Sequence, residues 1–171
     1  MTTGMETDII NQSDFGLKGR RVMNSGIRKI LSDYNSLIKE NDSIYRAAAK
    51  SSGISEAAFW ILYMIRESGE DYTQNRICSE IHIPKQTVNS ALSSLIKDGY
   101  ICLEQMSDRR SKKIILTDKG KALAESTVDT VIEAECKAFA GLETDERKEL
   151  IGLFRKYTEL FKKIMLKNGD E

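Results

Sequence analysis

The sequence has few of the residues on which disulfide, metal and catalytic sites depend. Its 171 residues include one histidine, His82, and three cysteines, which are odd in number, far apart and outside any C-x-x-C arrangement. This pattern argues against a disulfide framework, a zinc ribbon and a metal sensor. The sequence also lacks a G-x-G-x-x-G segment, a P-loop and a G-x-S-x-G nucleophile motif. We therefore expect neither an enzyme nor a bound cofactor.

Long apolar runs and proline are also scarce. No stretch approaches the roughly 18 consecutive apolar residues that a transmembrane helix needs. The first residues, Met1 to Asp14, lack the basic and then apolar order of a secretory signal. We therefore expect a cytoplasmic protein that makes no membrane contact. Pro84 is the only proline, and this scarcity favours long helices because proline breaks them.

Apolar residues recur with helical spacing through most of the chain after an aperiodic arm. Serine and threonine residues stand where helix N-caps are expected, among them Thr73, Thr117 and Thr144. The pattern predicts helices over residues 18–50, 55–67, 74–81, 84–97, 118–140 and from 145 onward. Residues 101–105 and 112–116 instead have the composition of a strand pair around a polar loop. The fold class is therefore mainly α with a small β-hairpin.

The middle of the chain has the order of a winged helix-turn-helix. A short helix, a tight turn at His82-Ile83 and a second helix are followed directly by the hairpin, which would form the wing. Several polar residues of the second helix lie off its apolar stripe, where they could contact base edges in a major groove. These residues are Lys85, Gln86, Thr87, Asn89, Ser90 and Ser93. Gln86 and Asn89 could pair with adenine, although a solvated helix face would have a similar composition.

Positive charge is concentrated in this region, although the formal net charge of the whole chain is zero. Residues 84–121 carry eight Lys or Arg and four Asp or Glu. Arg109, Arg110, Lys112 and Lys113 lie at or beside the hairpin tip, where arginine can enter a minor groove and lysine can hold phosphates. Asp108 would orient one of the arginines by a paired contact. The alternative is a charged turn that only keeps a strand edge soluble.

The wing sequence resembles that of the MarR family of transcriptional regulators. Asp108-Arg109-Arg110, followed by Leu116-Thr117-Asp118-Lys119-Gly120, is similar to the family's D-x-R and L-T-x-x-G signature. The resemblance covers roughly residues 20–165, and it implies a homodimeric repressor on a pseudo-palindromic operator, released by a small ligand. It also implies four segments: an arm (1–17), a dimerisation helix (18–54), a winged helix-turn-helix domain (55–117) and C-terminal dimerisation helices (118–171).

A ligand pocket is also implied, between the DNA-binding lobe and the dimerisation region. Aromatic residues on the first two long helices would suit an aromatic or amphipathic molecule, with ordinary core packing as the alternative. They are Tyr34, Tyr45, Phe59, Trp60 and Tyr63. No cysteine precedes Cys78, which argues against a peroxide sensor with its cysteine near the start of the first long helix. Cys78 and Cys102 are expected as small core residues.

Two functions for the winged helix remain open at this point. A winged helix can bind specific DNA, or it can serve as a protein-interaction module without specific DNA binding. A docking module has no need of four basic wing residues beside a polar helix. We therefore expect double-stranded DNA, a second copy of the chain and a small organic effector as partners.

Overall fold

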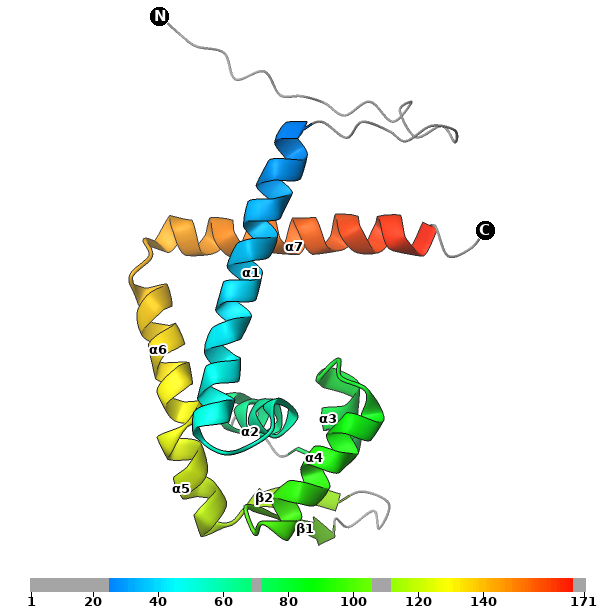
Figure 1. Ribbon diagram of the computed structural model, residues 1–171, viewed down its shortest axis with the longest axis vertical. Coiled ribbons are helices and arrows are strands. Elements are labelled where there is room, and N and C mark those ends of the chain that lie inside the picture. Colours follow the sequence, from blue (N-terminus) through cyan, green and yellow to red (C-terminus); the bar gives the residue numbers. More distant parts are fainter. Residues whose placement is uncertain (1–24, 69–71, 106–111, 168–171) are drawn as a thin grey trace, which may run out of the picture. The chain divides into compact units, whose positions relative to one another are not determined.

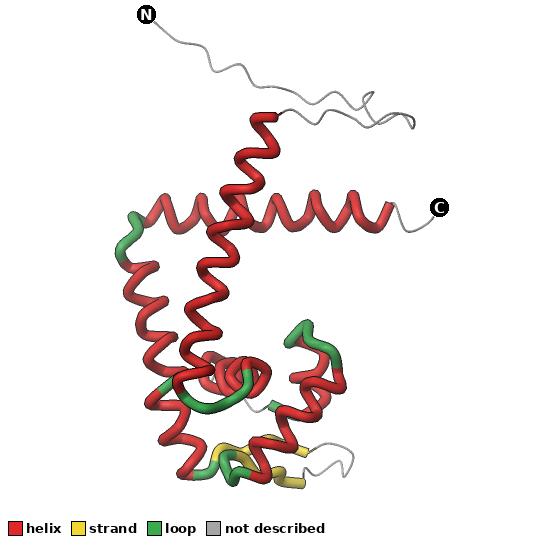
Figure 2. Tube along the Cα trace, in the orientation of Figure 1, coloured by secondary structure: helices red, strands yellow, loops and turns green. Residues whose placement is uncertain are grey.

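The computed structural model describes residues 25–68, 72–105 and 112–167 (Figure 1). Within them, the elements are α1 (Ser25–Ser51), α2 (Glu56–Ser68), α3 (Gln74–Glu80), α4 (Lys85–Lys97), β1 (Ile101–Gln105), β2 (Lys112–Leu116), α5 (Asp118–Ser126), α6 (Val128–Ala140) and α7 (Thr144–Lys167). The mainly helical fold with a small hairpin is therefore confirmed, as Figure 2 shows. None of the helices described is long and apolar enough to cross a membrane.

The chain divides into two compact units, Met1–Asn41 and Asp42–Glu171. The described part of the first unit is the N-terminal portion of α1, where Ile27, Ile30 and Leu37 are exposed. The second unit contains the end of α1 and every other described element, and its core is built from buried residues of α2, α4 and the hairpin.

Helix α2 lies at the centre of the second unit. Phe59, Ile61 and Leu62 are fully buried, and the helix packs against α4, α5 and α6. Its start is fixed by Ser55, whose hydroxyl accepts a hydrogen bond from the Ala58 N–H at 3.2 Å. The helix predicted over residues 55–67 therefore forms the centre of this unit's core.

The two wing strands pair antiparallel, with Ile101 opposite Leu116 and Leu103 opposite Ile114. Ile101 and Ile114 are buried, whereas Cys102 points to the other face of the hairpin and is exposed. The expectation that Cys102 is a core residue is therefore wrong, because strand alternation places it outside. Ile96, near the end of α4, is likewise 41% exposed although its spacing predicts burial.

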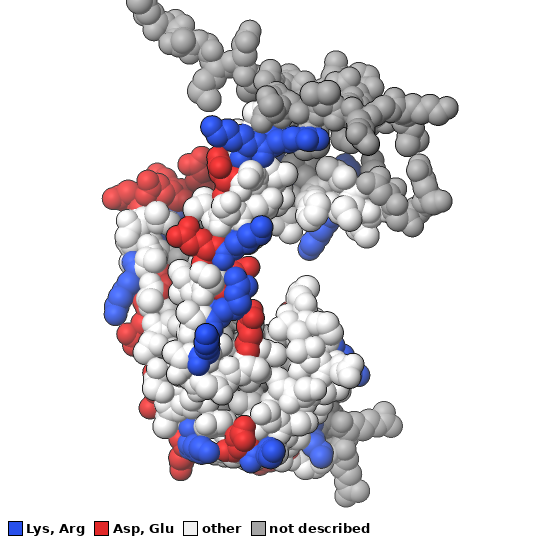
Figure 3. Space-filling model, in the orientation of Figure 1, with Lys and Arg blue, Asp and Glu red and all other residues white. Residues whose placement is uncertain are grey.

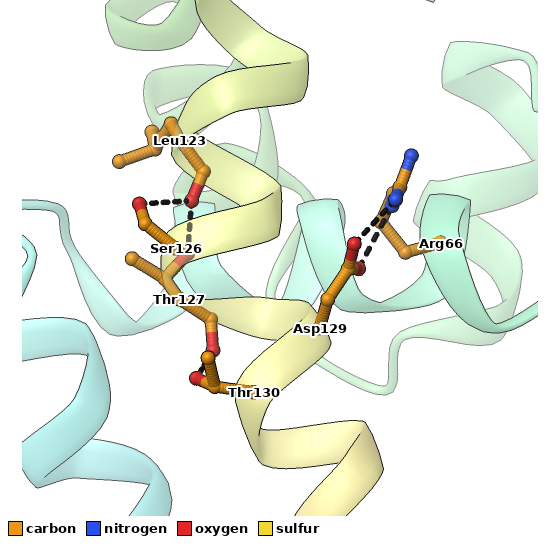
Figure 4. Close-up of polar contacts among 6 residues, drawn as sticks. All are labelled: Arg66, Leu123, Ser126, Thr127, Asp129 and Thr130. Atoms are coloured by element: carbon orange, nitrogen blue, oxygen red, sulfur yellow. Dashed lines mark hydrogen bonds and ion pairs between the residues drawn. The ribbon is translucent and has the colours of Figure 1, made fainter.

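The predicted helix over residues 118–140 is interrupted at Thr127, which separates α5 from α6. Thr127 has φ −127° and ψ −74°, away from helical values. Its hydroxyl and that of Ser126 both donate to the Leu123 carbonyl oxygen, and the Thr130 hydroxyl donates to the Thr127 carbonyl (Figure 4). Hydroxyls that bind nearby carbonyls compete with the backbone hydrogen bonds of a helix. The prediction of one continuous helix is wrong at this point, because it uses the spacing of apolar residues and takes no account of these hydroxyl groups.

An ion pair joins α2 to α6 directly after this break. Arg66 Nε donates to Asp129 Oδ1 at 2.8 Å, and a second guanidinium nitrogen contacts Oδ2 (Figure 4). Both side chains are about one-quarter to one-third exposed, at 31% for Arg66 and 26% for Asp129. A two-point Arg–carboxylate contact has a fixed geometry. The pair therefore fixes the first turn of α6 against α2.

Helix α7 begins at Thr144 and contains no buried residue within its described part. The residue before it, Glu143, donates its backbone N–H to Glu146 Oε2 at 2.7 Å, so the cap lies one position earlier than predicted. The predicted apolar stripe, which includes Leu153, Phe154 and Phe161, is 50–58% exposed at these three positions. A single copy of the chain therefore leaves a large apolar helix face in contact with water.

Gly120, in the first turn of α5, lies directly against the backbone of Tyr100, between α4 and β1. A Cβ at this position would be 1.8 Å from the Tyr100 carbonyl oxygen. Thr117 holds this approach, because its hydroxyl donates to the Gly99 carbonyl at 2.7 Å and accepts from the Gly120 N–H at 3.0 Å. The threonine and glycine of the L-T-x-x-G segment therefore join α5 to the end of the helix-turn-helix.

We expect Gly120→Ala to lower the free energy of unfolding by about 1–3 kcal/mol or more. The added methyl group would overlap the Tyr100 carbonyl oxygen, a backbone atom that moves only with the surrounding chain. Chemical denaturation would measure the change. Lys121→Ala is the matched control, since Lys121 makes only an exposed ion pair with Asp118, and it should change stability by less than about 0.5 kcal/mol. Equal effects of the two substitutions would contradict the steric explanation.

Candidate nucleic-acid interface

Helix α4 buries one face and turns the other outward. Val88, Ala91, Leu92 and Leu95 are buried, at the i, i+3, i+4, i+7 spacing of a single helix face. The six residues predicted to contact DNA lie off this face; Asn89 is half-buried and the others are exposed. Thr87 lies outside the shallow hollow of about 680 Å³ on this side of α4. The other five residues border it: Lys85, Gln86, Asn89, Ser90 and Ser93.

The turn between α3 and α4 is held by short polar contacts. His82 has φ 52°, a left-handed conformation that is rare outside glycine. Its Nδ1 lies 2.6 Å from the Glu80 carbonyl oxygen, so Nδ1–H donates to that carbonyl. The Glu80 carboxylate accepts from Arg76 Nε at 2.8 Å and from the Tyr72 hydroxyl at 3.0 Å. The Arg76 contact lowers the pKa of Glu80 below its usual value.

The base of the wing is attached to the start of α3. The Ile114 N–H donates to the Tyr72 carbonyl at 2.8 Å, and Thr73 forms an isolated bridge with Lys113. Lys112 is exposed and borders a hollow of about 230 Å³ together with residues of α3. The wing and the helix-turn-helix therefore share backbone contacts. Asp108, Arg109 and Arg110 lie outside the described residues.

Basic side chains accompany these elements. Figure 3 shows Lys and Arg side chains, with acidic ones between them, along the lower edge of the view, where α4, α5 and the strands lie in Figure 1. Lys119 of α5 donates to the Asp98 carbonyl at 2.7 Å, and its ammonium lies 4.6 Å from the centre of the Tyr100 ring. Its charge is thus held near the end of α4.

Sequence reasoning missed Gln74, the first residue of α3. Its Nε2 donates to Asn89 Oδ1 at 3.0 Å, so one predicted base-reading side chain is already engaged by a neighbouring helix. Gln74 also borders the hollow beside Lys112. Spacing along a single helix gives no signal for this contact, because the two residues meet only when α3 packs on α4.

A family model described as MarR family matches residues 52–111, which span the helix-turn-helix and the first half of the wing. Over this segment the chain is similar to the MarR family. YkoM of Bacillus subtilis, an uncharacterized HTH-type transcriptional regulator, is 28% identical over 109 residues, which are 63% of this chain and 70% of YkoM. The family and the relatives that the chain resembles are transcriptional regulators and not enzymes, which agrees with the prediction from the sequence.

Solved structures of MarR family regulators have a similar fold. Sco3205 of Streptomyces coelicolor, a MarR family regulator solved in complex with DNA, has a TM-score of 0.66 and 18% identity, over 84% of this chain and 92% of that one. BpsR of Bordetella bronchiseptica, whose DNA binding is regulated by 6-hydroxynicotinic acid, has a TM-score of 0.53 and 22% identity, over 74% and 98%. These likenesses support the winged-helix fold.

Four of the five aromatic residues predicted to line an effector pocket gather around α2. The Tyr45 and Trp60 rings are 4.8 Å apart, and those of Trp60 and Tyr63 are 5.4 Å apart. Phe59 joins them but is fully buried, so it is a core residue and not a surface of a pocket. Tyr34 belongs to the other unit of the chain.

Glu135 of α6 ties this cluster together. Its carboxylate accepts hydrogen bonds from both the Tyr45 hydroxyl and the Tyr63 hydroxyl, the latter at 2.6 Å. Burial and the bond to Glu135 raise the pKa of Tyr63 above its usual value, so the phenol stays a protonated donor. The end of α1, α2 and α6 thus meet at one carboxylate.

Beside the cluster, a hollow of about 460 Å³ lies between α2 and the α3–α4 turn. Trp60 and Tyr63 form part of its wall, and its remaining residues are apolar or acidic: Met64, Ile81, Ile83, Glu56, Glu67 and Glu80. No basic residue is among them. Within the described part of the chain, no group of histidine, cysteine and carboxylate side chains is arranged to hold a metal ion.

Proposed function

We propose that this MarR-family regulator is a homodimeric repressor that binds a pseudo-palindromic operator. In this proposal α4 reads the major groove, the wing contacts the flanking minor groove and phosphates, and a small ligand releases the protein from DNA. The observation that carries the proposal is the polar face of α4, which is turned outward by four buried apolar residues. The wing strand β2, which carries Lys112 and Lys113, is bridged to Thr73 at the start of α3 in the same unit.

The wing assignment is supported by charge and by attachment. Lys112 and Lys113 lie on β2, which is hydrogen-bonded to the start of α3, and Arg109 and Arg110 are in the connecting segment of the sequence. Because phosphate contacts fix the position of a protein on DNA while base contacts specify the sequence, we assign the wing lysines to phosphates. We assign Arg110 to the minor groove.

Selection of bound duplexes from a random library at moderate salt tests the proposal. We expect an enriched inverted repeat with half-site centres about one helical turn, roughly 10 base pairs, apart. Arg110→Ala should weaken binding to that sequence by about fivefold or more and reduce its salt dependence, because one counterion-releasing contact is lost. Lys148→Ala, which removes an exposed charge on α7, is the control and should leave affinity unchanged.

If the selection enriches no sequence, and the bound DNA is lost as the salt concentration rises, a winged-helix docking module would be favoured instead. Unchanged affinity in Arg110→Ala, together with a normal selected sequence, would refute only the wing assignment.

Dimerisation is supported by the apolar face of α7. Leu153, Phe154 and Phe161 are each at least half exposed, and the Tyr157 and Phe161 rings stack at 6.1 Å on the same face. Burying a large apolar side chain contributes about 1.5–3 kcal/mol, so a second copy that covers this face would be held strongly. Operators that contain two half-sites one helical turn apart are usually bound by symmetric dimers.

We expect sedimentation to give a dimer for the native chain and a monomer for the double variant Phe154→Asp with Phe161→Asp. Each substitution places a carboxylate in the proposed apolar interface, where its desolvation is costly. Lys156→Asp, on an exposed position of the same helix, should remain dimeric, and circular dichroism should show that both proteins keep their helices. A dimeric double variant would refute an interface on α7.

The effector site is proposed at the acidic hollow between α2 and the α3–α4 turn. Aromatic walls from Trp60 and Tyr63, with the carboxylates of Glu56 and Glu67 nearby, suit an aromatic cation. The third carboxylate there, Glu80, is already paired with Arg76. This class differs from the acid that regulates BpsR. A ligand here would contact Ile81 and Ile83, which flank the strained His82 in the turn before α4. Its binding would therefore act on the position of the recognition helix.

We expect calorimetry to show that 1-methylquinolinium binds more tightly than the similarly sized neutral 1-methylnaphthalene or the anion 1-naphthoate. Glu67→Gln should weaken binding of the cation several-fold, because one attractive charge is removed. Glu149→Gln, on α7, is the control. Equal or tighter binding of the anion would show that the effector is not a cation. The cation should also release the selected operator duplex in an anisotropy assay.

A further inference from the structure

Asn89, on the outward side of α4, is held by two groups of α3. Gln74 Nε2 donates to Asn89 Oδ1 at 3.0 Å, and the Cys78 thiol lies 4.0 Å from the same oxygen with hydrogen-bond geometry. An amide oxygen has two lone pairs, so both are occupied. Among the residues that the structure describes, none bonds to Asn89 Nδ2, which therefore keeps two N–H donors for another partner.

The supporting residues are themselves fixed. Thr73 caps α3 by accepting from the Arg76 N–H at 3.2 Å, and it also bridges to Lys113 of the wing. Gln74 follows directly, and the fully buried Ile77 anchors the same helix in the core. The backbone at Gln74 is therefore fixed on one side by the bridge of Thr73 to the wing and on the other by the burial of Ile77.

An amide restricted to donating has a different base preference from a free amide. Bidentate pairing with adenine needs the oxygen to accept from N6 while the nitrogen donates to N7. With its oxygen occupied, Asn89 offers only donors, which match the N7 and O6 acceptors of guanine or the O4 acceptor of thymine. Cytosine presents a donor, N4, in the major groove and would be rejected.

We propose that Gln74 is a specificity-determining residue that sets which bases Asn89 reads. It needs no base contact of its own, because it acts by occupying Asn89 Oδ1. The preferred base opposite Asn89 is therefore guanine or thymine, not the adenine that the α4 sequence alone predicts. This inference rests on the proposed function, in which α4 enters the major groove.

Selection from the random duplex library, repeated with variants, tests the inference. Asn89→Ala first locates the base pair that Asn89 reads, as the position where preference is lost. In Gln74→Glu the carboxylate can only accept, so the Asn89 amide should reverse and present its oxygen. Preference at that position should then move by about fivefold or more toward adenine or cytosine, the bases with donors. Gln74→Met, which has no donor, should raise the share of adenine.

Asn75→Glu is the matched control, because Asn75 lies beside Gln74 at the same hollow, whereas the groups of α3 that bond to the Asn89 side chain are those of Gln74 and Cys78. It adds the same charge, so it should weaken binding generally without changing base preference. Thermal unfolding of each variant would confirm that it is folded.

The outcomes separate the two proposals. A native chain that selects no sequence overturns the proposed function and this inference with it. A native chain that selects an inverted repeat but prefers adenine opposite Asn89 overturns only the inference. The inference is equally overturned if Asn89→Ala changes no position, or if Gln74→Glu and Asn75→Glu give the same base preference as the native chain.

Discussion

Packing around α2 is the constraint on which the rest of the second unit depends. Phe59, Ile61 and Leu62 are fully buried, and α4, α5 and α6 all pack on this helix. Buried side chains at close-packed density leave little freedom for their neighbours. The burial of one face of α4 against this centre is what turns the opposite, polar face toward solvent.

Polar contacts then fix what apolar packing leaves undetermined. Apolar contacts are non-directional, so they hold helices together without defining their ends. The Arg66–Asp129 pair fixes the start of α6 against α2. Thr117 and Gly120 fix the start of α5 against the segment that follows α4. The wing is similarly tied to α3 through Tyr72 and Thr73. Most of these contacts cross between elements that are distant in sequence.

The two surfaces proposed for function differ in charge. The segment that contains α4 and the wing is rich in Lys and Arg, whereas the described residues that line the hollow beside Trp60 include three carboxylates and no basic side chain. Opposite charge on two sites of one small unit allows polyanionic DNA and a cationic effector to be attracted separately. The α3–α4 turn lies between them, since Ile81 and Ile83 wall the hollow and Lys85 begins the recognition helix.

The sequence by itself determined the mainly helical class, the helix-turn-helix, the strands of the wing and the outward face of α4. These features follow from periodicity and capping, which are local in the chain. Only the tertiary structure decided the break at Thr127, the exposure of Cys102, the burial of Phe59 beside the hollow and the contact of Gln74 with Asn89. Each depends on hydrogen bonds or packing between neighbouring turns or separate elements, where a one-dimensional pattern does not state which groups meet.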